Sequence, residues 1–334
     1  MRRAAAVVFL FVLFCVQAFS QQSMSLKEAL ANPEKAINVS IYGGELESLP
    51  QELAKCKNLE QISILENPGL TEFPEVLFEC KKLRFLEIRN SHYTYLESPI
   101  DQGLRVLPEG IRNLKNLEVL IINWTDLDSL SPALAECKKI KELDLSNNML
   151  TDSSKLSVIG ELENLEILRI GNNSDYLPAS FSNLKKLKEI SLQQPAIAEG
   201  CFMNDGLLRK FPTVICKIKS LEILNLSGEM LIRSVPSDIT GLDNLKELVW
   251  YGSKLRELPA GIGKMKSLEL IVLGPECVHG EFWYEANELR LPIDFFELKK
   301  LKHFHVGGSL SARPLKGGSW AQVEKMLKAN TVSD

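Results

Sequence analysis

The chain has 334 residues, of which 45% are apolar and 25% are charged, and its formal net charge at pH 7 is −4. This is the composition of a globular protein, long enough for two ordinary domains or for one array of repeats. The slightly acidic balance argues against nucleic acid as a partner, because phosphate binding draws on clustered lysine and arginine.

Residues 1–20 have the layout of a secretory signal peptide. Arg2 and Arg3 precede an apolar run over 4–16, and residues 18–20 (AFS) form a small-x-small cleavage site. The run is short for a membrane span, and the bulky Phe14 disfavours a lipoprotein anchor on Cys15. We therefore expect a secreted or extracytoplasmic protein whose mature chain has no membrane span.

Residues 21–35 are expected to form an N-terminal cap over the exposed end of a core. Ser25 is suited to cap a short helix, because Glu28 follows three residues later in the arrangement of a capping box.

From residue 36 the pattern L-x-x-L-x-L recurs, typically every 22–25 residues. The units begin at Ala36, Leu59, Leu83, Leu117, Ile140, Leu165, Leu187, Leu221, Leu245, Leu268 and Leu301. The alternation of Leu143 and Leu145 with polar residues predicts a half-buried strand, and most units continue through an apolar-Pro pair such as Leu107-Pro108. One unit cannot bury its apolar side alone, so the units must stack into a continuous core with one parallel sheet.

Two stretches match a known repeat closely: LRVLPEGIRNLKNLEVLII over 104–122 and LRELPAGIGKMKSL over 255–268. In these the chain resembles the leucine-rich-repeat family, in its L-x-x-L-P-x-x-I form, from residue 36 to about 306. The resemblance implies an α/β fold: a curved solenoid with its parallel sheet on the concave face and short helical or irregular convex returns. We expect a domain of about eleven units over 36–318. The turn asparagine usual in this family stands at Asn67, Asn148 and Asn173, whereas Gly44, Thr125 and Ser253 replace it elsewhere.

The second residue of each unit alternates in charge. From the second unit on, the series runs Glu60, Arg84, Glu118, Lys141, Glu166, Lys188, Glu222, Lys246, Glu269 and Lys302. Neighbouring strands lie about 4.8 Å apart, so each inner charge should lie between two opposite ones. We expect this charge ladder to support stability and register rather than to bind a ligand. It also suggests that the array grew two repeats at a time.

Three insertions lengthen their units by ten or eleven residues, near 92–103, 195–206 and 276–287. Each follows a strand, so all three should project from one edge beside the concave sheet. Their apolar and aromatic residues are candidate partner contacts, since aromatics are favoured interface anchors: Tyr93, Tyr95, Phe202, Met203, Phe282, Trp283 and Tyr284. The alternative interpretation is that these side chains fold back onto the solenoid.

The concave strand positions form a second candidate surface. Its middle column is predicted to run Ser40, Ser63, Glu87, Ile121, Asp144, Arg169, Ser191, Asn225, Val249, Val272 and His305. Candidate contacts on and beside this face are Tyr42, Arg89, Asn123, Trp124, Arg169 and Tyr251. The mixed character of the face favours a protein or peptide partner, or a glycan.

Six cysteines remain after residue 20. Cys56, Cys80 and Cys137 take the closing apolar position of their units and are expected to be buried thiols, with Cys216 similar. Cys201 and Cys277 lie inside insertions, and a bridge between them is left open.

No sequence motif of an enzyme is found: there is no nucleophile elbow, no Gly-rich phosphate loop and no H-E-x-x-H run. A metal-dependent enzyme built on Cys277, His279, His303 and His305 is a third-ranked hypothesis, since their spacing matches no compact metal motif. We expect no cofactor and no metal.

Residues 319–334 should supply a C-terminal cap helix and tail. Four N-x-S/T sequons begin at Asn38, Asn123, Asn172 and Asn225, and most would place sugars on the concave face. This favours a bacterial exported protein in which the sequons are chance matches. The sequence thus predicts a secreted, non-enzymatic protein-binding module, with a structural or adhesive cell-surface component as the alternative.

Overall fold

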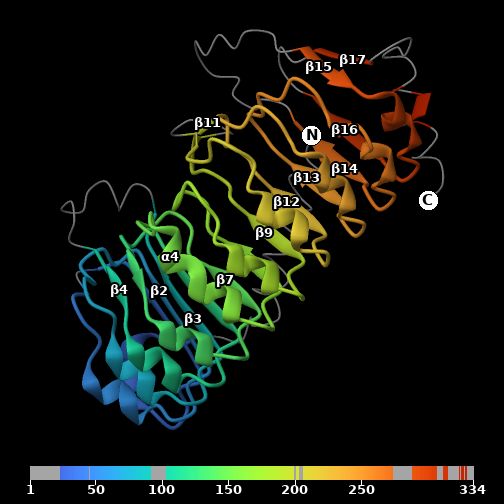
Figure 1. The fold of residues 1–334 in the computed structure, drawn as a ribbon. Helices are drawn as coiled ribbons and strands as arrows, with labels where there is room; N and C mark the ends of the chain where they lie inside the picture. The colour runs from blue at the N-terminus through green and yellow to red at the C-terminus, as the bar shows by residue number, and fades with distance from the viewer. Residues whose placement is uncertain are drawn as a thin grey trace.

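The computed structural model describes residues 23–44, 46–91, 103–198, 201–202, 206–273, 288–306 and 311–314, together with 323, 325–326 and 328. Within these residues an eleven-stranded sheet runs the length of the molecule, with its strands in chain order. Every pair in it is parallel. The stacked units form one curved array (Figure 1).

The strands of this sheet are short and evenly placed, one in each unit. They are β1 (Asn38–Tyr42), β2 (Gln61–Leu65), β3 (Phe85–Arg89), β5 (Val119–Asn123), β7 (Glu142–Asp144), β8 (Ile167–Arg169), β9 (Glu189–Ser191), β12 (Ile223–Asn225), β13 (Glu247–Val249), β14 (Leu270–Val272) and β16 (His303–His305). The predicted parallel sheet is therefore confirmed.

The returning segments are single 3-10 turns. They are η1 (Gln51–Lys55), η2 (Glu75–Glu79), η3 (Glu109–Asn113), η4 (Pro132–Glu136), η5 (Ser157–Glu161), η6 (Ala179–Asn183), η7 (Thr213–Lys217), η8 (Ser237–Gly241), η9 (Ile262–Lys264) and η10 (Ile293–Glu297). A proline usually precedes the turn, as Pro50 does η1, where its fixed φ suits the entry and its carbonyl accepts the amide of Leu53 at 3.0 Å. The predicted short returns are confirmed.

Smaller elements complete the array. α2 (Leu26–Ala31) begins with the predicted capping box between Ser25 and Glu28, and α4 (Ser153–Leu156) precedes η5. Two-stranded sheets join β4 (Val106–Leu107) to β6 (Ser129–Leu130), β10 (Ala196–Ala198) to β11 (Cys201–Phe202), and β15 (Glu288–Leu291) to β17 (Ser311–Pro314). In the part of the C-terminal cap that is described, residues 323, 325–326 and 328 are helical.

The core is a stack of repeated apolar columns between the sheet and the 3-10 turns. Leu143 and Leu145 of one unit and Leu168 of the next are completely buried. A buried asparagine fixes the turn after the strand: Asn148 donates to the carbonyls of Ile122 and Leu145 at 2.7 and 2.8 Å. Its own oxygen accepts the amide of Thr125 at 3.1 Å. Asn148 thus binds its own unit to the preceding one.

Three cysteines confirm the sequence prediction of buried thiols. Cys56, Cys80 and Cys137 have 1% or less of their surface exposed. Each Sγ–H faces a carbonyl of the preceding unit or, for Cys56, of the N-terminal cap; the shortest contact joins Cys137 to Ile111 at 3.2 Å. A thiol therefore fills a leucine position and also satisfies a backbone acceptor. Cys216 is buried as well.

These thiols should resist alkylation while the protein is folded. Burial raises the pKa of Cys80 and of Cys137 to about 11. Because the thiolate is the nucleophile, iodoacetamide at pH 8 should modify both roughly a hundredfold more slowly than in denaturant. Peptide mapping by mass spectrometry reports each cysteine separately. Equal rates in the native and the denatured protein would contradict the burial.

Candidate functional site

The concave face of the sheet has three side-chain columns, and its register is the predicted one. Ser40 pairs with Ser63, Ser63 with Glu87, and the middle column continues strand by strand to His305. Successive strands therefore place equivalent side chains side by side, about 4.8 Å apart.

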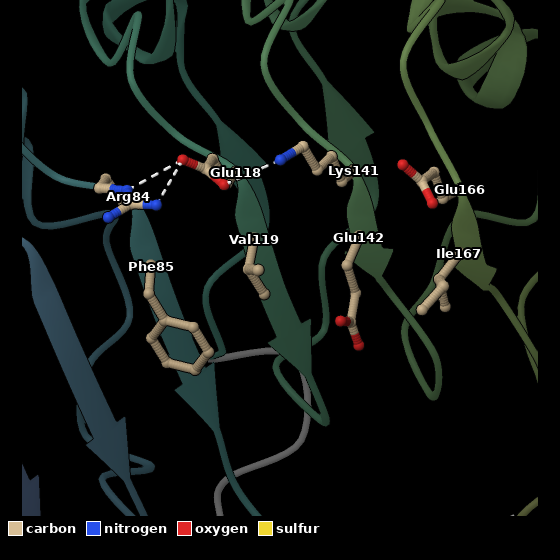
Figure 2. A pocket seen from close by; sticks show the side chains of 8 residues that line it. All are labelled: Arg84, Phe85, Glu118, Val119, Lys141, Glu142, Glu166 and Ile167. Atoms are coloured by element: carbon tan, nitrogen blue, oxygen red, sulfur yellow. Dashed lines mark hydrogen bonds and ion pairs between the residues drawn. The ribbon is translucent and has the colours of Figure 1, made fainter. Parts of the chain in front are cut away.

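A hollow of about 230 Å³ lies on this face between β3 and β8 (Figure 2). Its lower wall consists of side chains from the first concave column, the third residue of each unit: Phe85, Val119, Glu142 and Ile167. All four are half-buried. Three apolar side chains therefore stand on a sheet face that no other element of the described chain covers.

The upper rim of the hollow is part of the charge ladder. Arg84, Glu118, Lys141 and Glu166 stand at the starts of four neighbouring strands (Figure 2). Glu118 accepts from Arg84 at 2.8 Å and from Lys141 at 3.2 Å. Burial works to raise the pKa of Glu118, but the bonds from the two cations hold it below its usual value.

The ladder continues along the sheet as predicted. Arg84 also lies 3.9 Å from Glu60. The later pairs are Lys188–Glu166 at 2.6 Å, Lys246–Glu222 at 2.6 Å and Lys302–Glu269 at 3.9 Å. The predicted alternation therefore produces ion pairs between neighbouring strands.

Replacing Glu118 with glutamine should destabilise the protein modestly. The side chain is 25% exposed and bridges two cations, so we expect a loss of about 1 kcal/mol in the free energy of unfolding. The loss should shrink at 1 M salt, where charges are screened. Urea unfolding at two salt concentrations measures it, with Glu269→Gln at a more exposed site as the control. A loss that is independent of salt would contradict the role of the ion pairs.

Below the ladder, Arg169 joins two carboxylates of the first concave column. Its guanidinium lies 2.5 Å from Glu142 and 3.0 Å from Glu189, on the strands to either side of β8. The three side chains are 18%, 12% and 17% exposed. This half-buried clamp shares Glu142 with the lining of the hollow. Further along the column, burial and the neighbouring Glu189 and Glu269 raise the pKa of Glu247.

The comparisons with known proteins identify this architecture. No family model matches the sequence. The TMV resistance protein N of Nicotiana glutinosa is 26% identical over 281 residues, which are 80% of this chain and 22% of that protein. The chain therefore spans about a fifth of the length of this curated relative.

Solved structures agree in fold over most of the chain. An internalin from Listeria monocytogenes superposes with a TM-score of 0.62 at 17% identity, covering 91% of this chain and 78% of that one. The leucine-rich-repeat domain of the type III effector XopL superposes with a TM-score of 0.58 at 23% identity, covering 74% and 79%. The fold is a leucine-rich-repeat solenoid.

Several predicted contacts lie on the first strands of this leucine-rich-repeat sheet. Tyr42, Arg89 and Asn123 lie in the third concave column. Tyr42 is 75% exposed, and Arg89 pairs with Glu87 at 2.9 Å. Trp124 follows β5 with a φ of 57°. The predicted contacts on the described strands thus flank the hollow rather than line it, apart from Arg169 in its clamp.

The other predicted contacts lie either elsewhere on the array or outside the described residues. Tyr251 follows β13, several strands away along the leucine-rich-repeat array. Tyr93, Tyr95, Met203, Phe282, Trp283 and Tyr284 lie outside the described residues. Phe202 belongs to β11, and only its backbone is described. The role of the insertions therefore stays a prediction.

The charged rim was predicted as part of the charge ladder, but the residues of the lower wall were missed, because only the second and third concave columns were considered as candidate contacts. The signal was present in the first column, where Val119, Glu142, Ile167, Glu189 and Ile223 alternate between apolar and acidic. Apolar residues at positions expected to face solvent indicate a candidate binding surface.

Glu229, which occupies the turn-asparagine position of its unit, was also not predicted from the sequence as a functional residue. Its side chain is 2% exposed and accepts from Leu208 N–H at 2.9 Å and from the amide of Gln194. Burial raises the pKa of Glu229 to about 7, against the lowering effect of these bonds. A Cβ on Gly206, which has a φ of +83°, would lie 2.4 Å from the carboxylate. Glu229 therefore ties together the two ends of the second insertion.

The residues of the hypothesised metal centre are only partly within the described ranges. His303 and His305 are exposed on β16, on either side of Phe304, while Cys277 and His279 lie outside the described residues. Within the ranges that the structure describes, no three histidine, cysteine or acidic side chains are grouped to hold a metal ion. The same ranges contain no helix that is long and apolar enough to cross a membrane.

Proposed function

We propose that this chain is a non-enzymatic protein-binding module that holds a segment of a protein or peptide in the concave hollow. The observation that carries the proposal is the group of half-buried apolar side chains, Phe85, Val119 and Ile167, beside a charged rim. Binding sites of proteins combine an apolar centre with a polar border in this way.

The size of the hollow suits one anchoring side chain of the partner. A buried cavity of roughly 150 Å³ holds benzene, and the hollow measures about 230 Å³. An aromatic or branched aliphatic residue would therefore fit between Phe85 and Ile167. Charged and polar groups of the partner would meet the alternating signs of the ladder, which favours a mixed sequence over a polymer of one sign.

Export from the cytoplasm is part of the proposal. It is supported by the basic and then apolar sequence of residues 1–20 and by the small-x-small site that follows. The sequence features that suggested a bacterial source are weaker and add nothing to the binding mechanism.

Selection from a displayed peptide library would test the binding site. Peptides selected on the wild-type chain should bind a Phe85→Glu variant at least about tenfold more weakly, because a buried charge replaces an apolar contact. The matched control is Ile293→Glu, since Ile293 is 66% exposed on η10, away from the concave face. Titration by fluorescence anisotropy gives the affinities. Equal binding by Phe85→Glu and the wild type would place the site elsewhere.

A further inference from the structure

A second charged surface lies at the turns that lead into the strands, two or three residues before each position of the charge ladder. Each of ten turns between a 3-10 turn and the next unit ends in two exposed or half-buried residues. These twenty positions hold twelve lysines, all exposed, and two acidic residues, Glu163 and Asp243. We call the twelve the lysine edge: Lys57, Lys81, Lys82, Lys115, Lys138, Lys139, Lys185, Lys186, Lys219, Lys266, Lys299 and Lys300.

The concentration of lysine runs against the charge of the whole chain. The sequence contains 39 basic and 43 acidic side chains, yet twelve of the basic ones are gathered in this single row. The parallel strands all start at the same side of the sheet, so the row follows that side for the length of the array (Figure 1).

Several of these lysines are held in place by neutral partners. Lys82, Lys139 and Lys186 each donate to the side-chain oxygen of an asparagine in the preceding unit, at 2.7 Å in all three cases. Those asparagines, Asn58, Asn116 and Asn164, in turn donate to a backbone carbonyl of the unit before, at 2.7 to 2.9 Å. The relay orders the ammonium groups without neutralising them.

The remaining contacts of the row neutralise only part of its charge. Lys185 and Lys219 donate to the backbone carbonyls of Ser182 and Gly241. Four lysines lie within 2.9 to 3.9 Å of a carboxylate: Lys81, Lys115, Lys138 and Lys266. Cations are favoured at these turns because they interact with the free carbonyl groups at the ends of the preceding 3-10 turns. This interaction does not require two adjacent lysines in one turn, as at 81–82, 138–139, 185–186 and 299–300.

We propose that the lysine edge binds a linear anionic polysaccharide laid along the row. The cations form a narrow file that repeats with the strand spacing of about 4.8 Å, which suits a thin chain with regularly spaced sulfates or carboxylates. None of the twenty positions is aromatic or arginine, the residues that stack on bases and grip phosphate groups. None is apolar, as insertion into a lipid surface would require.

The test compares three anionic probes on one set of variants of the full chain. The probes are dextran sulfate, a 20-base-pair DNA duplex, and vesicles containing phosphatidylserine. The edge variant carries Lys139→Gln, Lys185→Gln, Lys186→Gln and Lys219→Gln. The control variant loses four exposed cations elsewhere: Lys27→Gln, Arg209→Gln, Lys210→Gln and Arg233→Gln. Because Lys139 and Lys186 belong to the relay, a second edge variant changes Lys57, Lys185, Lys299 and Lys300 to glutamine. Circular dichroism checks the folding of each.

The wild type and the control should bind dextran sulfate with similar affinity, which falls as salt is added. Both edge variants should bind it about tenfold more weakly. The proposal is overturned if all four proteins bind alike, or if the edge variants lose affinity only for DNA or only for vesicles. Since Phe85 is unchanged throughout, failure here leaves the concave site untouched, and failure of the peptide selection leaves this surface untouched.

Discussion

Raising the pH from 4.5 to 8 should destabilise the wild-type protein by about 3 kcal/mol relative to a Glu229→Gln variant. In the unfolded chain this carboxyl has its ordinary pKa of 4.5, whereas in the folded protein burial raises the pKa to about 7. Folding therefore favours the protonated form. The contribution is fully present below pH 4.5, is lost as the pH rises to about 7, and stays lost above it. A difference of 2.5 pKa units corresponds to about 3 kcal/mol.

The measurement is the free energy of unfolding in urea across this pH range. Other carboxylates, such as Glu118, have a lowered pKa and impose the opposite trend, so only the difference between wild type and variant is informative. Glutamine at 229 can keep the bond from Leu208, and Gln194 has an oxygen without a partner that can accept its amide. The exposed Glu257→Gln serves as the control. Parallel curves for wild type and Glu229→Gln would contradict the assignment.

Replacing Arg169 with leucine should cost about 3–5 kcal/mol of unfolding free energy. The change removes the cation that pairs with both Glu142 and Glu189, which are 12% and 17% exposed. Two carboxylates would then remain poorly solvated and without their ion pairs. Urea unfolding at pH 7 measures the loss.

A triple variant, Arg169→Leu with Glu142→Gln and Glu189→Gln, should recover most of that stability, because removing a whole buried ion cluster is far less costly than breaking it. Arg105→Leu is the matched control, since Arg105 is 48% exposed and pairs with a single carboxylate, Asp128. It should cost no more than about 1 kcal/mol. If Arg169→Leu costs no more than this control, the clamp has no structural role.

The register of the sheet could be predicted from the sequence because leucine spacing determines it. A slip of one residue would turn Leu143 and Leu145 to solvent and Asp144 into the core. The same spacing places Lys141 beside Glu118, so the ion pairs followed from the count of residues alone. The cysteine positions were readable for a similar reason, since each takes the place of a leucine.

The hollow and the buried carboxylate of Glu229 are formed at positions where the repeat pattern does not determine the residue type. The third residue of a unit does not face the core, so the core does not constrain its type. The apolar surface is recognised only when the structure places Phe85, Val119 and Ile167 side by side. Glu229 looked like one more surface acid. Its burial results from the way the chain returns after the second insertion, at Gly206 and Leu208, and no local pattern encodes that long-range contact.

Because the sign of the charge ladder alternates from one unit to the next, deletion of one unit and deletion of two units affect the ladder differently. Residues 117–164 make up two units, whose second residues are Glu118 and Lys141. Removing both would set Arg84 beside Glu166 and preserve the alternation. Removing one alone, 117–139, would set Arg84 beside Lys141, two cations on adjacent strands. Gain or loss of a single repeat therefore places like charges on adjacent strands, which is unfavourable. Gain or loss of two repeats preserves the alternation.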